Sequence, residues 1–250
     1  EFLDSRPDLR KLVVALESTS FYGVHIANFL SSHETLASFR TAVYCLNPKT
    51  VANYKKSFID LGKNDFVDAF VLADFARVGR ITNKPWRGSQ FLALKRLTRH
   101  RLHLVECMTR EKAYLVSNLY LKFSELQMLE KDDQPFCDIY GTTSSGVLTQ
   151  YLSPEEIIDS SEEELVAFLA EKSRNRIKDI SKTADLLKKA ARDSYRLDKA
   201  LYEPLNVSIA SSFNCIETFK KEIKVIDAAI EREIKGLNPN AFIILQSIDG

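Results

Sequence analysis

The chain has 250 residues, of which 45% are apolar and 28% charged, an ordinary balance for a soluble globular protein of one or two domains. The net charge of +1 excludes an overall basic surface, no apolar run approaches the roughly 18–20 residues of a membrane span, and the N-terminus has no secretory signal layout. The four cysteines form no C-x-x-C pair, so we expect reduced thiols and a cytoplasmic protein.

Residues 11–83 carry alternating strand and helix signals. Short apolar runs predict buried strands, and apolar residues at helical spacing predict the helices between them. In chain order we expect a strand at Leu12–Leu16, a helix at Phe21–Leu30, a strand at Thr41–Leu46 that stops before Asn47-Pro48, a helix at Lys49–Phe58 and a helix at Asp65–Arg80. This order predicts a βαβ arrangement with parallel strands.

From about residue 88 the pattern becomes helical. We expect one long basic helix ending near Glu130, a connector over Asp132–Tyr151, a helix start at Ser153-Pro154, a long helix over Ser161–Leu201 that Pro204 interrupts, and a last helix from Val207 to Lys235. The predicted fold class is α/β plus all-α. Its predicted divisions are a first domain at residues 1–83, the basic helix at 84–131 and a helical, coiled-coil region at 132–250.

Local charge differs from the net charge. From Lys84 to Lys131 there are ten basic and four acidic residues, and from Lys172 to Lys199 there are again ten and four, so each segment carries +6. Two such helices could each follow a phosphate backbone. Charge alone favours the simpler interpretation that both segments are solvated helix faces.

The last predicted helix has an apolar seam. Its members, which step by three, four, three and four residues, are Ile216, Phe219, Ile223, Ile226 and Ile230. This spacing is typical of a surface that pairs with another helix.

Three carboxylates form a candidate metal site. Glu17 follows an apolar run and is expected at the carboxyl end of a strand, where ligand sites gather in open α/β sheets. Asp65 and Asp68 are three apart, so a helix places them on one face. All-oxygen ligands suit Mg²⁺. The competing interpretation is structural: acids stabilise a helix N-terminus, Asn64 or Asp65 can cap it, and Glu17 then makes no special contact.

Two further patterns favour structural roles. His103 and Cys107 are four apart on one predicted helix, with His100 one turn earlier, but a zinc site needs a further ligand that the sequence does not place. Ser18 to Ser20 have no histidine in a triad layout and are interpreted as start signals for the following helix.

The two acidic motifs and their surroundings resemble the DEDD transposases of the insertion-sequence group that includes the Piv invertase. In chain order the similar blocks are Glu17–Tyr22 with Ser20 where the family has Gly, Leu46–Pro48, Lys63–Ala69, Gly79-Arg80, and Leu245–Gly250 with Asp249 where the family has Pro. The Glu17 and Asp65/Asp68 blocks are the specific ones. The helical part is generic.

The resemblance implies an incomplete RuvC-like, RNase H-type domain whose four acids bind Mg²⁺, and three of them map to Glu17, Asp65 and Asp68. The first acid of the family belongs to an opening strand that this chain does not contain, and Asp4 and Asp8 are poor substitutes because neither follows an apolar strand. The family's C-terminal serine domain would begin about where this chain stops. We therefore expect weak or no strand-transfer activity from the 250 residues alone.

The resemblance also implies partners. These are DNA, a structured noncoding RNA as in RNA-guided recombinases, and further copies of the chain in a dimer or tetramer paired through the seam from Ile216 to Ile230. The candidate nucleic-acid contacts are Lys63, Lys95, Arg96, Arg99 and Arg101. No membrane partner is expected.

Two other functions stay open. The first is a RuvC-type structure-specific nuclease that cuts branched DNA without transposition, against which the long helices after Arg80 argue. The second is a non-catalytic helical module that binds nucleic acid or mediates oligomerisation.

Overall fold

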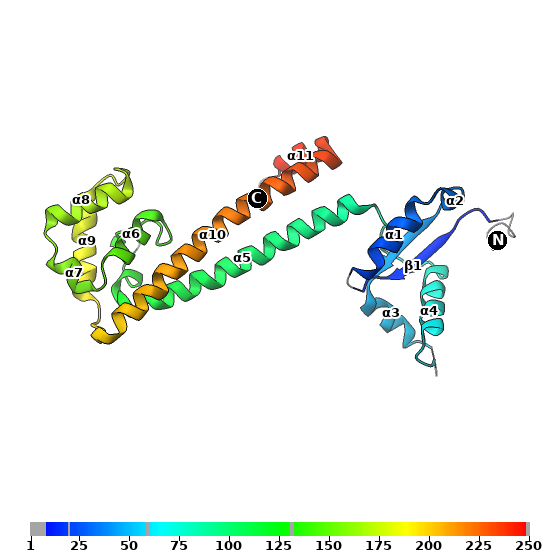
Figure 1. Ribbon diagram of the computed structural model, residues 1–250, viewed down its shortest axis with the longest axis horizontal. Helices are drawn as coiled ribbons and strands as arrows, with labels where there is room; N and C mark the ends of the chain where they lie inside the picture. Colours follow the sequence, from blue (N-terminus) through cyan, green and yellow to red (C-terminus); the bar gives the residue numbers. More distant parts are fainter. Residues whose placement is uncertain (1–8, 20, 59–60, 131–132, 249–250) are drawn as a thin grey trace. The chain divides into compact units, whose positions relative to one another are not determined.

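The protein is described by a computed structural model for residues 9–19, 21–58, 61–130 and 133–248 (Figure 1). It divides into two compact units, residues 1–96 with 236–241 and residues 97–235 with 242–250. Mostly helical structure with a small parallel sheet agrees with the predicted combination of α/β and helical parts. None of the helices in the described ranges combines the length and apolar character of a membrane span.

The first unit contains a parallel pair of strands. Strand β1 covers Val13–Glu17 and β2 covers Ala42–Leu46, and their register runs from Val13 opposite Ala42 to Glu17 opposite Leu46. The connection between them contains helices α1 (Tyr22–Ser32) and α2 (Glu34–Ala37). The predicted parallel βαβ arrangement is therefore confirmed.

Helices cover the pair of strands. Helices α3 (Pro48–Lys55) and α4 (Asp65–Arg77) share an apolar cluster with the strands, in which Leu46, Val51, Val71 and Phe75 are buried and Ala15 and Tyr44 pack against them. Because side chains alternate along a strand, Val43 lies on the opposite face, where α1 contacts β2. The α4 side of the sheet is thus the side to which Ala15, and two residues later Glu17, belong.

The segment after α4 is fastened to β2. The backbone N–H of Trp86 donates to the carbonyl oxygen of Val43 at 2.7 Å, and the indole Nε1 of Trp86 donates to Oδ1 of Asn28 at 2.8 Å. Asn28 in turn donates from Nδ2 to the hydroxyl of Ser89 at 2.8 Å. These bonds fix the start of helix α5, which covers Ser89–Lys122.

The second unit is built of helices. After α5 they are the 3₁₀ turn η1 (Ser124–Gln127), α6 (Thr142–Gln150), α7 (Pro154–Asp159), α8 (Glu162–Ser173), α9 (Ile180–Asp193), α10 (Lys199–Leu237) and α11 (Pro239–Gln246). The predicted start at Ser153-Pro154 is confirmed, since the hydroxyl of Ser153 caps α7 by accepting from the N–H of Glu156.

Several predicted helix limits are wrong. The basic helix ends at Lys122 and not near Glu130, and the expected connector over Asp132–Tyr151 contains α6. The expected long helix over Ser161–Leu201 is two helices and the start of a third. Arg174 and Asn175 both adopt left-handed backbone conformations, with φ of 53° and 56°, and they end α8.

Pro204 does not interrupt a helix, contrary to the prediction. It lies inside α10, near the N-terminal end of that helix. A proline removes one backbone donor and crowds the carbonyl four residues earlier, so α10 continues past Pro204 at the cost of a helical hydrogen bond.

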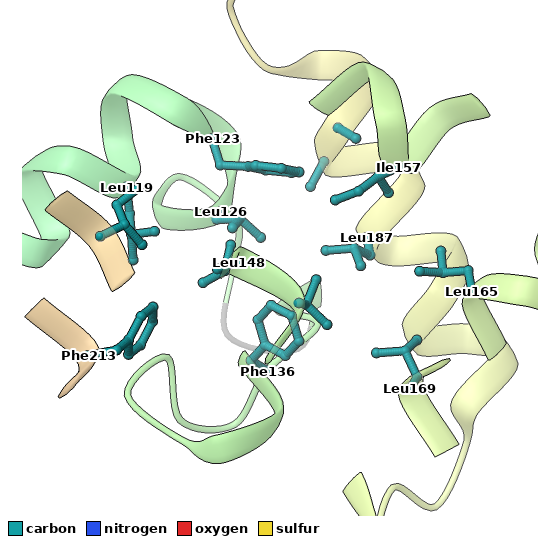
Figure 2. Packing of buried hydrophobic residues seen from close by; sticks show 14 of the residues in the cluster. Leu119, Phe123, Leu126, Phe136, Leu148, Ile157, Leu165, Leu169, Leu187 and Phe213 are labelled. Carbon is teal, nitrogen blue, oxygen red and sulfur yellow. The ribbon is translucent and has the colours of Figure 1, made fainter. Parts of the chain in front are cut away.

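The core of the second unit joins α5, η1, α6, α7, α8, α9 and α10 (Figure 2). Leu119 of α5 and Phe213 of α10 lie on one side of the cluster, and Ile157, Leu165 and Leu187 come from α7, α8 and α9 on the other. Burial of large aliphatic side chains stabilises a core by about 1.5–3 kcal/mol each. This core therefore holds α6 to α9 to the ends of the two long helices.

Lys122 lies inside this core and is completely buried. Its Nζ donates to the carbonyl oxygens of Leu148 at 2.7 Å and Tyr151 at 2.5 Å, and to Oδ1 of Asn206. Two of these acceptors are carbonyls at the C-terminal end of α6, where helix carbonyls have no helical partner. Lys122 therefore fastens α6 to α5 and α10, and it does not belong to an exposed basic surface.

Candidate functional site

Glu17 lies at the carboxyl end of β1, as predicted. It is exposed, and the strand register places it opposite Leu46. By alternation it belongs to the same face as Ala15, the face against which α4 packs. The backbone continues the ladder one residue further, because Ser18 donates from its N–H to the carbonyl oxygen of Leu46 at 2.8 Å.

Asp65 and Asp68 both lie in the first turn of α4. Asn64 caps this helix, since its Oδ1 accepts a hydrogen bond from the N–H of Val67 at 2.9 Å. Asp68 is three residues before the buried Val71, which is four before the buried Phe75, so Asp68 continues the sheet-facing stripe of α4. Asp65 is exposed.

A lysine that the sequence motifs did not single out faces this helix start. Nζ of Lys55, the last residue of α3, lies 2.5 Å from Oδ1 of Asp68. The two side chains are 24% and 47% exposed, so solvent screens the pair. The carboxylate of Asp68 thus already has a cationic partner.

Asp74, two turns further along α4, is a second carboxylate that the motifs missed. The hydroxyl of Tyr54 donates to its Oδ2 at 2.7 Å, and Arg77 donates to its Oδ1 at 2.8 Å. These two hydrogen bonds lower the pKa of Asp74, while the bond to Asp74 raises the pKa of Tyr54. The network joins α3 to α4 and has a structural role.

The structure does not bring the three acids together as metal ligands. Across the residues that the structure describes, no group of three or more His, Cys, Asp or Glu side chains is arranged to hold a metal ion. Helix α4 does pack against β1, so the elements that carry Glu17 and the aspartate pair are neighbours. Asp4, Asp8, Ser20 and Asp249 lie outside the described residues.

The same finding applies to the histidines and the cysteine of α5. Nε2 of His103 is 3.7 Å from the sulfur of Cys107, and Nη2 of Arg110 donates to that sulfur at 3.3 Å. These three side chains form a small polar cluster on the helix surface.

The candidate basic residues have different surroundings. Lys63 and Arg99 are exposed. The guanidinium of Arg96 lies 4.3 Å from the ring centre of Phe21, a cation–π contact. Burial raises the pKa of the Cys45 thiol, and the positive charge of Lys95 opposes part of that increase. Arg101 forms an ion pair with Asp227 of α10, in which its Nε lies 2.5 Å from Oδ1.

Arg96 also borders a cleft that no sequence motif predicted. It is an open depression of about 400 Å³ between α1 and the start of α5, lined by Phe21, Val24, His25, Ser89, Leu92, Ala93 and Arg96. A cation beside an exposed ring at its border suits an aromatic or anionic group.

The predicted oligomer seam is partly used within the chain. Ile216 belongs to the core of the second unit, and it and Ile223 are buried, at 1% and 9% exposure. Phe219, Ile226 and Ile230 are half-buried. Its role between subunits stays a prediction.

Replacing Asn64 with alanine is expected to destabilise the protein by about 1 kcal/mol, because α4 loses its N-terminal cap. Replacement with serine, which can also cap, should cost only a few tenths of a kcal/mol. Urea unfolding of both variants measures the difference. Equal losses would show that the side chain acts in some way other than capping.

Comparison with known proteins concerns the part of the chain that contains these acids. The sequence profile of a transposase family, the DEDD transposases of the IS110 type, matches residues 2–124. The match includes the strand that ends at Glu17, the helix that starts at Asp65 and all of α5. No curated protein matches the chain. Residues 2–124 therefore carry a segment of the IS110-type DEDD transposase kind, the family that the motifs around Glu17 and Asp65 resemble.

Proposed function

We propose that the full-length protein is a DNA transposase that breaks and rejoins DNA strands with Mg²⁺. The observation that carries this proposal is the family match over residues 2–124, a segment that includes Glu17, Asp65 and Asp68. Within the site, Glu17, Asp65 and Asp68 are three of the acids that hold the metal. The fold class that this function implies is RuvC-like, and the parallel β1–β2 pair with α4 packed on it is compatible with that class.

The chemistry of these donors suits a hard cation, because all three offer carboxylate oxygens. When bound in such a site, Mg²⁺ activates an attacking oxygen and stabilises a leaving oxygen in phosphodiester chemistry. The three side chains do not share one ion in the described arrangement. Assembly of the site therefore requires Asp68 to exchange Lys55 for the metal, together with the remaining acid of the DEDD set.

The role of this chain's residues follows from their positions. Glu17 is fixed by the strand register, whereas Asp65 and Asp68 are fixed by the capped start of α4. A carboxylate held by a strand and two held by a helix that packs on that strand are on rigid elements. Lys63, exposed next to the cap residue, is a candidate contact to a DNA phosphate.

Further parts of the proposal concern partners. We propose that a structured noncoding RNA guides the protein to its target. We also propose that the protein assembles into a dimer or tetramer through the half-buried residues of the seam on α10. Lys95, Arg96 and Arg99 are the proposed nucleic-acid contacts on α5, and Arg101 can serve only if it leaves Asp227.

One alternative has an observation in its favour. The Lys55–Asp68 ion pair and the absence of a three-ligand group among the described residues are what a helical nucleic-acid-binding or assembly module with a decayed active site would show. Such a module would bind nucleic acid without changing its covalent structure.

The test uses the full-length protein and DNA that carries its own coding sequence with both flanks. Incubation with Mg²⁺ should yield broken and rejoined products, and incubation with EDTA should yield none. Broken strands without rejoined products would favour a RuvC-type nuclease. Binding without any breakage, at all Mg²⁺ concentrations, would favour the non-catalytic module and contradict the proposal.

A further inference from the structure

The turn between α8 and α9, with the exposed face of α9, carries six cations that the fold does not use. They are Arg174, Arg176, Lys178, Lys182, Lys189 and Arg192, and all six are exposed. In the ranges that the structure describes, none of the six forms an ion pair. We call these six residues the α8–α9 basic surface.

Other cations of the same segment are engaged in the fold. Nζ of Lys188 donates to the carbonyl oxygen of Ser160 at 2.5 Å, and Nε of Arg196 lies 2.7 Å from Oε1 of Glu155. Lys172 lies 3.0 Å from Glu171. The fold therefore separates cations that hold helices together from those of the α8–α9 basic surface.

The other segment of +6 differs in this respect. Lys122 is buried, Arg101 is paired with Asp227, and Lys112 lies over the ring of Tyr140 at 4.7 Å. The two segments have equal charge counts in the sequence, but the fold engages different cations in each. Among the described residues, the segment around α9 therefore keeps a continuous group of exposed cations for a ligand, whereas several cations of the other segment are engaged within the fold.

The backbone at the tip of the turn adds a further observation. Arg174 is the C-terminal cap of α8 and has φ 53° and ψ 42°, a left-handed conformation for which glycine is the usual residue at a helix end. An arginine here carries a conformational cost that a glycine would not. Its presence keeps a cation at the tip of an exposed turn.

We propose that the α8–α9 basic surface binds the phosphodiester backbone of nucleic acid. Lys182 and Arg192 are ten residues apart on one helix, about 15 Å, a length over which a nucleic-acid backbone presents several phosphates. Asp179, Asp185 and Asp193 lie nearby, and six cations against three acids leave an excess of positive charge. Asp179 is occupied in part as the cap of α9, accepting from the N–H of Lys182.

This inference rests on the proposed function in so far as both require a nucleic-acid ligand. The surface lies outside residues 2–124, so the family match does not assign it. DNA and RNA share the backbone chemistry, and the experiment distinguishes them.

The first test measures binding of the 250-residue chain to labelled duplex DNA and duplex RNA by fluorescence anisotropy, in EDTA. Arg176→Gln with Lys178→Gln should weaken binding about tenfold or more near 100 mM salt and flatten the salt dependence, because two phosphate contacts are lost. The matched control is Lys221→Gln with Lys224→Gln, the same charge change at exposed positions of α10. Its affinity should stay within about threefold of that of the parent.

The second test separates the side chain of Arg174 from its backbone. Arg174→Gly removes the cation and relieves the left-handed conformation, so binding should weaken about threefold or more while the melting temperature stays equal or rises. Asn175→Gly relieves the neighbouring left-handed residue without removing charge, and its affinity should not change. This pair remains informative if the double variant fails to fold.

Loss of affinity for DNA only, for RNA only or for both supports the proposal and names the source of the backbone. Equal weakening by the α9 and α10 double variants, or no weakening by either Arg174→Gly or the first double variant, overturns it. The proposal is also overturned if the variants lose binding to vesicles that contain phosphatidylserine but keep their affinity for nucleic acid. These binding assays contain no Mg²⁺, so they test the basic surface independently of strand breakage. If the protein breaks no DNA, the binding results still hold. If the variants do not weaken binding, the strand-breakage result still holds.

Discussion

Replacing Asp68 with asparagine is expected to reduce Mg²⁺-dependent DNA strand breakage by the full-length protein at least about a hundredfold. Loss of a group that only orients a metal ligand costs about 10–100-fold, so loss of a ligand should cost at least as much. Asparagine keeps the shape of the side chain and removes its charge. Product formation on DNA carrying the protein's own coding sequence measures the effect.

The partner of Asp68 supplies the control. Lys55→Met breaks the same ion pair from the other side, which should leave strand breakage within about threefold of the parent. Because both side chains are partly exposed, each variant should lose less than about 1 kcal/mol of stability. If the two variants lose activity equally, Asp68 acts through its pair with Lys55, and the assignment as a metal ligand is wrong.

The first unit shows what local sequence signals can predict. The strand predicted at Leu12–Leu16 is observed one residue later, at Val13–Glu17, and the strand that stops before Asn47-Pro48 and the helix that starts at Asp65 are observed where short-range chemistry predicts them. Each depends on neighbours in sequence, such as an apolar run, a proline after a cap residue or an asparagine before the first turn. Lys55 could not be found in this way, because its partner is thirteen residues away.

The helix limits after residue 122 show where such signals fail. Arg174 ends α8 in a left-handed conformation that arginine disfavours, and Pro204 lies inside α10 although proline disfavours helices. In both places the packing of α6 to α9 around one core outweighs a local preference. Local sequence patterns do not show whether core packing will outweigh the conformational preference of a single residue.

Charge counts fail for a related reason. Two segments with ten basic and four acidic residues each appear equivalent in the sequence. The fold places one of those lysines, Lys122, in the core and leaves Arg174 at the tip of a turn. A count of charges therefore predicts electrostatic surfaces only after the fold has shown which charges are satisfied within it.

Replacing Lys122 with methionine is expected to lower the free energy of unfolding by about 2–4 kcal/mol at pH 7. Three acceptors lose their donor: the carbonyls of Leu148 and Tyr151 and Oδ1 of Asn206. A buried acceptor left without a partner costs about 1–3 kcal/mol, and relief of the buried charge offsets part of the total. Lys189→Met, at an exposed position of α9, is the control and should change stability by less than about 0.5 kcal/mol.

The pH dependence of this difference tests whether Lys122 is buried as a charged group. Burial lowers its pKa from an ordinary 10.5 to about 8, against a weaker opposing effect of the negative Glu156. Between these values the unfolded chain binds more protons than the folded one, so the native protein gains stability as pH rises. The stability difference between the parent and Lys122→Met should therefore grow by about 3 kcal/mol from pH 8 to 10.5. Urea unfolding across this range, with Lys189→Met in parallel, measures it, and a difference that is flat with pH would show that the amine is solvated.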